Sequence, residues 1–142
     1  ASDVYKRQAK ESTLRIVDYK TGGNPKTPAN IEQLFTPSET RPNYIFQTFL
    51  YASIMCRQQT LKVAPALLYI HRAASDSYSP VIEMGEPRQP KIPVNNFTFF
   101  EDEFRKRLQT LLEEIFSENE PFTQTEDIKK CSYCDFKAIC KR

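Results

Sequence analysis

Residues 14–23 of the chain read LRIVDYKTGG, and this stretch decides the fold. Its first half is a short apolar run rich in β-branched residues, which predicts a buried strand over 14–20. Side chains two residues apart in a strand point to the same face, so we expect Asp18 and Lys20 side by side where the strand reaches the surface. Such a pair can bind a divalent cation and a phosphate. An ordinary ion pair closing a strand is the alternative explanation.

The remaining sequence predicts helices and strands that alternate around this stretch, and hence an α/β fold with a mixed central sheet. Residues 21–41 predict a loop with one helical turn near 31–35, because prolines are frequent there and no apolar period is sustained. The expected elements that follow are a buried helix over 43–59, a strand over 64–73, a short edge strand over 81–84 and an amphipathic helix starting at Phe100. The 43–59 helix should pack on the sheet, and its connection should be a right-handed crossover if the two main strands are parallel.

Length and composition predict one polar globular domain. The 142 residues are 39% hydrophobic, and no apolar run approaches the ~18 residues that span a bilayer. No signal peptide opens the chain, so a cytoplasmic location without membrane contact is expected. Residues 1–71 carry nine Lys and Arg against five Asp and Glu, a net charge of +4, whereas residues 72–142 carry −2. The basic half holds the Asp18–Lys20 stretch, which mildly favours a phosphate-bearing ligand there.

The first eight residues, ASDVYKRQ, are polar and without periodicity. They resemble a peptide produced when sequencing-adapter DNA is translated as coding sequence. We therefore leave residues 1–8 out of the fold prediction and assign 9–142 to the domain, as the C-terminal part of a longer protein.

The C-terminal residues hold three of the four cysteines, with the spacing C-x2-C-x5-C at Cys131, Cys134 and Cys140. In a chain without secretion signals this spacing favours a metal or iron–sulfur site over disulfides. Zinc and an iron–sulfur cluster both normally take four ligands, and the tail supplies three. The remaining cysteine, Cys56, is expected to be an ordinary buried thiol on the 43–59 helix.

Taken together, these segments resemble the RecB/AddB-like branch of the PD-(D/E)XK nuclease superfamily, which carries a C-terminal cysteine cluster. Residues 17–22 (VDYKTG) are similar to its metal-and-lysine strand, and residues 47–52 (QTFLYA) to its Q-x3-Y helix. The cysteines at 131–140 are similar to the ligands of its [4Fe–4S] cluster, with zinc as the alternative metal. The resemblance implies a partial restriction-endonuclease-like core.

The resemblance also implies roles for individual residues. Asp18 and the main-chain carbonyl of Tyr19 would bind the catalytic Mg²⁺ or Mn²⁺. Lys20 would orient the attacking water or stabilise the charged phosphorus intermediate, and Gln47 and Tyr51 would fix the geometry of the site. The implied partners are DNA ends or single strands and a helicase subunit or helicase-like region of the same protein.

The sequence departs from the family pattern before residue 14. The opening helix, a strand with a second metal-binding aspartate and the first cluster cysteine are missing, so the fourth cluster ligand is absent. His71 lies after the motif and is interpreted as structural. We therefore expect a fragment with exposed apolar surface, marginal stability and little cleavage of its own. The alternatives are a DNA-binding module derived from the nuclease fold and a small zinc-binding interaction domain built on the tail.

Overall fold

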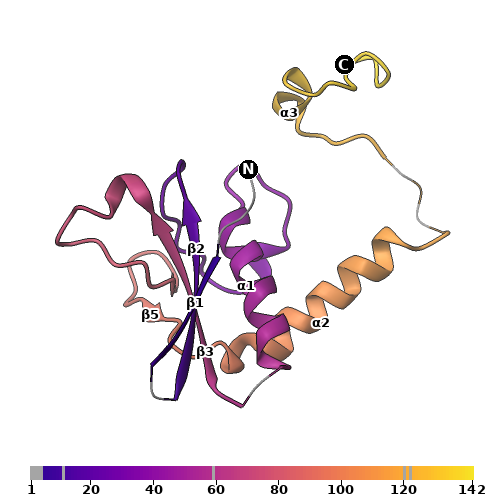
Figure 1. Cartoon of the computed structure of the whole chain (residues 1–142). Coiled ribbons are helices and arrows are strands. Elements are labelled where there is room, and N and C mark those ends of the chain that lie inside the picture. The colour runs from indigo at the N-terminus through magenta and orange to yellow at the C-terminus, as the bar shows by residue number, and fades with distance from the viewer. Residues whose placement is uncertain (1–4, 11, 59, 120, 122) are drawn as a thin grey trace.

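A three-stranded sheet in the order β1-β2-β3 carries the rest of the molecule (Figure 1). β1 (Tyr5–Lys10) runs antiparallel to β2 (Thr13–Lys20), and β2 runs parallel to β3 (Lys62–Tyr69), so the sheet is mixed, as predicted. The computed structural model describes residues 5–10, 12–58, 60–119, 121 and 123–142. The remaining elements are η1 (Glu32–Leu34), α1 (Asn43–Cys56), η2 (Ile70–Arg72), β4 (Glu83–Met84), β5 (Ile92–Pro93), α2 (Thr98–Ile115) and α3 (Ile128–Ser132).

β2 and β3 have slightly different limits from those expected. β2 begins one residue early, at Thr13, and β3 ends at Tyr69 although the sequence predicts a strand to residue 73. Lys20, the last residue of β2, is the register partner of Tyr69. Because β2 ends there, β3 loses its neighbour, and the chain turns into the 3-10 helix η2.

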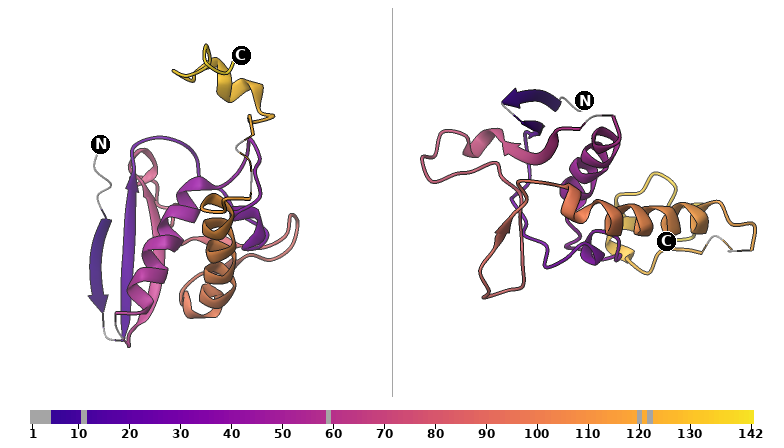
Figure 2. Two further views of the ribbon diagram at one scale, coloured as in Figure 1. Left: turned by 90° about the vertical axis from the view of Figure 1, so that its right-hand side faces the viewer. Right: turned by 90° about the horizontal axis from the view of Figure 1, so that it is seen from below.

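α1 lies against one face of the sheet, and α2 lies beyond it on the same side (Figure 2). Alternate residues of β2 point to this face, so Leu14 and Ile16 join Ile45 and Phe49 of α1 in one buried core. The helix begins after Pro42, as expected, but ends at Cys56 rather than at residue 59. Arg57, which follows as the C-cap, is exposed.

The aromatic cluster between α1 and α2 fixes the start of α2, which begins at Thr98, two residues earlier than predicted. Phe104 is fully buried, and its ring lies 6.0 Å from that of Phe49 and 5.8 Å from that of Phe97. The second half of α2 extends beyond α1 (Figure 1), so Leu112, Ile115 and Phe116 of its apolar face are exposed. No described helix is both long and apolar enough to cross a bilayer.

Residues 78–97 close the outer edge of β3. The Tyr78 hydroxyl accepts from the Tyr69 N–H at 2.8 Å and donates to the Leu67 carbonyl at 2.7 Å, and so satisfies backbone groups that a further strand would otherwise pair. The predicted edge strand over 81–84 is shorter than expected. Val81 forms a single bridge to Ala66, and β4 pairs with β5, an element that the sequence analysis missed.

Both ends of the chain differ from the expectation. Residues 5–8, left out of the fold prediction, belong to β1 and pair with β2, while their proposed adapter origin stays a prediction. From the sequence we expect the C-terminal helix and the cysteine tail to close over the region that precedes the Asp18–Lys20 strand in the family pattern, whereas α3 and the segments around it stand apart from the sheet (Figure 1). An ion pair between this tail and the body joins Lys129 Nζ to Glu39 Oε1 at 2.9 Å, and Glu39 lies in the loop before α1.

Candidate active site

Asp18 and Lys20 form a close ion pair on the helix-facing side of β2. Lys20 Nζ lies 3.0 Å from Asp18 Oδ2, and the two side chains are 10% and 0% exposed. Their i, i+2 spacing places both on the face that also carries Leu14 and Ile16, as the sequence predicts, but both are buried, whereas the prediction placed them where the strand reaches the surface. A strand that is otherwise apolar on this face therefore ends in two buried charges beneath α1.

α1 brings Gln47 and Tyr51 to this pair. Lys20 Nζ donates to Gln47 Oε1 at 2.8 Å, and Gln47 Nε2 donates to the Tyr51 hydroxyl at 2.9 Å. Because Gln47 and Tyr51 are four residues apart in a helix, their side chains lie on the same side of it and can form a hydrogen bond with each other. The bond that the Gln47 amide donates to Tyr51 sets the orientation of this amide, so that its oxygen faces the lysine.

Thr48 and Tyr44 also reach the pair, and the sequence analysis missed both. Thr48 Oγ1 lies 3.3 Å from Asp18 Oδ2 and donates to the Tyr44 carbonyl at 2.8 Å. The Tyr44 ring lies over Lys20, with 4.6 Å from Nζ to the ring centroid. The available signal was their position: both are polar-tipped, and Tyr44 lies three residues before Gln47 while Thr48 lies three residues before Tyr51 on a largely apolar helix.

Asp18 fits part of a metal site. Its Oδ1 atom is buried and has no hydrogen-bond partner among the residues that the structure describes. A buried carboxylate oxygen without a donor is a suitable ligand for a hard cation such as Mg²⁺ or Mn²⁺. Over the same described ranges, no three His, Cys, Asp or Glu side chains gather into a cation site. Asp18 and the Tyr19 carbonyl therefore supply at most part of the coordination that such an ion needs.

Aromatic side chains cover the pair on its solvent side. Tyr69 is 3% exposed, and burial is the main cause that raises its pKa to about 12, with nearby Asp18 as one smaller contribution. Gly23 has φ +82°, and a Cβ there would come within 2.9 Å of the Tyr44 ring. The glycine therefore allows the loop after β2 to pack directly on Tyr44.

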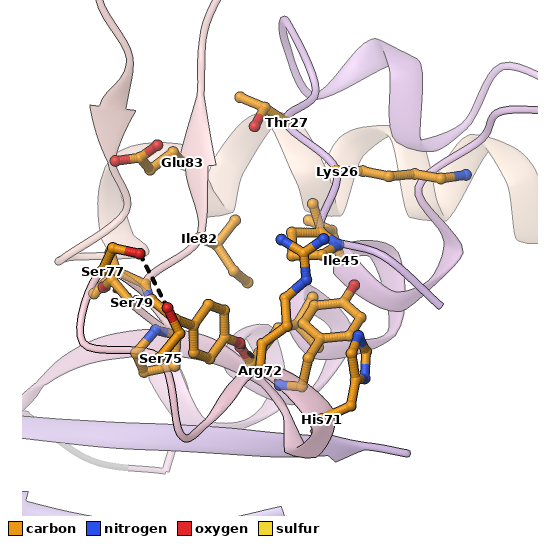
Figure 3. Close-up of a pocket in the computed structure, with 16 residues that line it drawn as sticks. Lys26, Thr27, Ile45, His71, Arg72, Ser75, Ser77, Ser79, Ile82 and Glu83 are labelled. Carbon is orange, nitrogen blue, oxygen red and sulfur yellow. Dashed lines mark hydrogen bonds between the residues drawn. The ribbon is translucent and has the colours of Figure 1, made fainter. Parts of the chain in front are cut away.

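A cavity of about 510 Å³ opens beside this cover, at the carboxyl end of β3 (Figure 3). Tyr69 forms part of its wall, together with His71 and Arg72 of η2 and residues of the 75–83 loop. His71, interpreted from sequence as structural, is exposed at this cavity, and its ring meets Tyr69 edge-on at 6.0 Å. Tyr69, the register partner of Lys20, thus also forms part of the cavity wall.

The cysteines remain separate thiols in the structure. Cys131, Cys134 and Cys140 lie in the tail, where no described group of three ligands converges, so the geometry does not assemble the predicted cluster. Cys56 is half-buried, and burial raises its pKa to about 11, with a smaller contribution from the Glu101 charge. It ends α1 at the opposite end of the molecule from α3 (Figures 1 and 2), so it cannot complete the set in this arrangement.

Comparison with known proteins finds a family match. A family model of the PD-(D/E)XK nuclease superfamily matches residues 4–141, a range that contains every site residue named above. The match also begins inside the first eight residues. No curated protein and no solved structure matches the chain.

Proposed function

Because the chain belongs to the PD-(D/E)XK nuclease superfamily, we propose that it is a Mg²⁺- or Mn²⁺-dependent deoxyribonuclease module that hydrolyses phosphodiester bonds at DNA ends. The observation that carries this proposal is a series of polar contacts: Asp18 forms an ion pair with Lys20, Lys20 donates a hydrogen bond to Gln47, and Gln47 donates one to Tyr51. A buried structural ion pair needs acceptors for the remaining ammonium donors, but it does not need an acceptor that a second side chain holds in place. A catalytic lysine does need it, because its ammonium must stay in one place while negative charge develops on the phosphate.

Asp18 would hold the metal, with the Tyr19 carbonyl as a further ligand. Such an ion, when bound, polarises the phosphate and lowers the pKa of a bound water. Lys20 then presents a fixed positive charge to the phosphoryl oxygens or to the attacking water. Gln47 holds the Lys20 ammonium, and Tyr51 holds the Gln47 amide, so the helix sets the position of the charge. Further metal ligands would come from the substrate phosphate, from water or from carboxylates beyond the described residues.

The test measures metal binding and cleavage separately. Mn²⁺ binding to the purified chain, followed by the electron paramagnetic resonance signal of free Mn²⁺, should be lost in Asp18→Asn and kept in Lys20→Ala. Linear DNA with Mn²⁺ should be cleaved slowly or not at all by these 142 residues, and any cleavage should disappear in Lys20→Ala. Binding that survives in Asp18→Asn, or cleavage that survives in Lys20→Ala, would refute the assigned roles. Circular dichroism of each variant checks that the fold is kept.

The second candidate function is a DNA-binding module without cleavage, derived from the same fold. The observation that favours it is the burial of Asp18, whose side chain is 0% exposed, together with the incomplete ligand set among the described residues. This candidate predicts that the chain binds DNA equally well with Asp18→Asn and takes up no Mn²⁺. The experiment above therefore separates the two functions.

The finer assignments follow the resemblance of the motifs. We propose that the module works in recombinational repair, within an AddB/RecB-like protein in the cytoplasm and beside a helicase. For the tail, we propose that Cys131, Cys134 and Cys140 take up a [4Fe–4S] cluster after a rearrangement that brings them together. Metal analysis and an absorption band near ~400 nm would distinguish the cluster from zinc. A metal-free protein after anaerobic reconstitution would exclude both.

A further inference from the structure

The cavity beside Tyr69 has the size and lining of a ligand site that the proposed chemistry does not use. Its volume of about 510 Å³ lies within the ~300–1,000 Å³ range of small-molecule sites. The walls come from the 25–27 segment, the carboxyl end of β3, η2 and the 75–83 loop (Figure 3). Segments far apart in the sequence therefore meet around one polar hollow.

Side chains of both charges line this cavity. Arg72 directs its guanidinium into the hollow, and Glu83 lies on the opposite wall (Figure 3). One Arg72 N–H donates to Asn24 Oδ1 at 3.3 Å, which uses one of the five donors of the group. Lys26 also lines the cavity, but its ammonium is directed away to the carbonyls of Thr40 and Arg41. Arg72 is therefore the cation positioned to bind an anion there.

Two serine hydroxyls face the same hollow. Ser75 Oγ and Ser77 Oγ lie 3.0 Å apart in the exposed loop after η2. Each hydroxyl can rotate to donate to an oxygen anion. An arginine fork with nearby hydroxyls suits the tetrahedral oxygens of a phosphate and offers no fixed pattern that reads a base edge.

Tyr69 connects this cavity to the Asp18–Lys20 pair. It pairs in register with Lys20, and its hydroxyl donates to the Asn24 carbonyl at 3.1 Å. The side chain of the same Asn24 accepts from Arg72. A chain of contacts thus runs from the candidate active site through Tyr69 and Asn24 to Arg72.

We propose that this cavity is a backbone subsite for single-stranded DNA, in which Arg72 binds a phosphate that flanks the one to be cleaved and Ser75 and Ser77 add hydrogen bonds. The position of the subsite relative to the scissile phosphate rests on the proposed nuclease function. The phosphate binding itself does not, because it needs neither metal nor cleavage. Since the contacts are to phosphate, the subsite binds strands of different sequence alike.

The test is metal-free binding of a fluorescein-labelled dT12 oligonucleotide, measured by anisotropy in EDTA. Arg72→Ala should weaken binding about tenfold at low salt, as expected for the loss of a charge-assisted hydrogen bond. It should also make the negative slope of the log of the association constant against log salt concentration shallower by about 0.7, the value for one phosphate on a single strand. Arg72→Lys should recover part of the affinity, because it keeps the charge but not the fork.

Arg57→Ala is the matched control, since it removes the same charge from an exposed position next to the other end of β3. Equal weakening by Arg57→Ala and Arg72→Ala would overturn the subsite, because long-range charge would then explain both. Absence of dT12 binding by the wild type would overturn the subsite too. So would a result in which Arg72→Ala weakens the binding of inorganic phosphate but leaves the binding of dT12 unchanged. Arg72→Ala should weaken the binding of a mixed-sequence oligonucleotide by the same factor as the binding of dT12.

The two proposals fail in different ways. If Arg72→Ala weakens dT12 binding while Asp18→Asn leaves Mn²⁺ uptake unchanged, the subsite stands and the nuclease assignment fails. If Lys20→Ala abolishes cleavage while Arg72→Ala leaves both binding and cleavage unchanged, the nuclease stands and the subsite fails.

Discussion

Removal of the Lys20 ammonium should destabilise the fold much more than loss of a surface ion pair. The Asp18 side chain is 0% exposed, and one of its oxygens already lacks a hydrogen-bond partner among the described residues. Lys20→Met keeps the length of the side chain but leaves this carboxylate without its cation. Breaking a buried pair in this way costs about 3–5 kcal/mol. The free energy of unfolding, measured by urea denaturation at pH 7, should fall by that amount.

The double variant Asp18→Asn/Lys20→Met tests the cause of this loss. If the uncompensated charge is responsible, the double variant should recover about 2 kcal/mol or more relative to Lys20→Met alone. Arg105→Met is the surface control, because Arg105 pairs with an exposed Asp102 at 3.2 Å, and should cost less than about 1 kcal/mol. A loss for Lys20→Met as small as this control would refute the burial argument, since the carboxylate would then be hydrated.

Three further outcomes follow from packing, backbone conformation and titration. Phe104→Ala should lower the free energy of unfolding in urea by about 3–5 kcal/mol because Phe104 is fully buried, whereas Phe99→Ala, at 83% exposed, should change it by less than about 0.5 kcal/mol. Gly23→Ala should lower the melting temperature because its φ of +82° and the neighbouring ring exclude a Cβ, whereas Gly22→Ala, with nothing within 4 Å, should not; equal shifts would contradict this. The pKa of Tyr69 is raised to about 12, so its stabilisation is complete below pH ~10 and is lost as the pH rises through about 12; Tyr69→Phe should remove this part of the alkaline loss in urea titrations.

The local geometry of the site was predictable, because it follows from fixed periodicities. The spacing of Asp18 and Lys20 in a strand, and of Gln47 and Tyr51 in a helix, already places each pair on one face. The resemblance to a nuclease branch predicted that the two pairs belong to one site. In the structure they lie within hydrogen-bond distance of each other. Their catalytic roles stay predictions.

The contacts that depend on distant segments could not be predicted in the same way. Tyr69 reaches the site only because β3 pairs with β2 in one particular register, which no local pattern specifies. The extent of burial along α2 was also unpredictable, since its apolar stripe continues to Phe116 while its packing partner ends earlier. The position of the cysteine tail is a third case, because its few contacts with the body are between exposed polar residues.

The way in which β3 is bordered limits how this sheet can grow. The Val63 carbonyl accepts from the Phe97 amide at 2.7 Å, and the Leu67 amide donates to the Pro80 carbonyl at 2.8 Å. With Tyr78 occupying the next positions, this side offers little backbone for strand addition by another molecule. Recruitment of a foreign strand, whether in a functional complex or in an aggregate, would therefore have to begin beside β1.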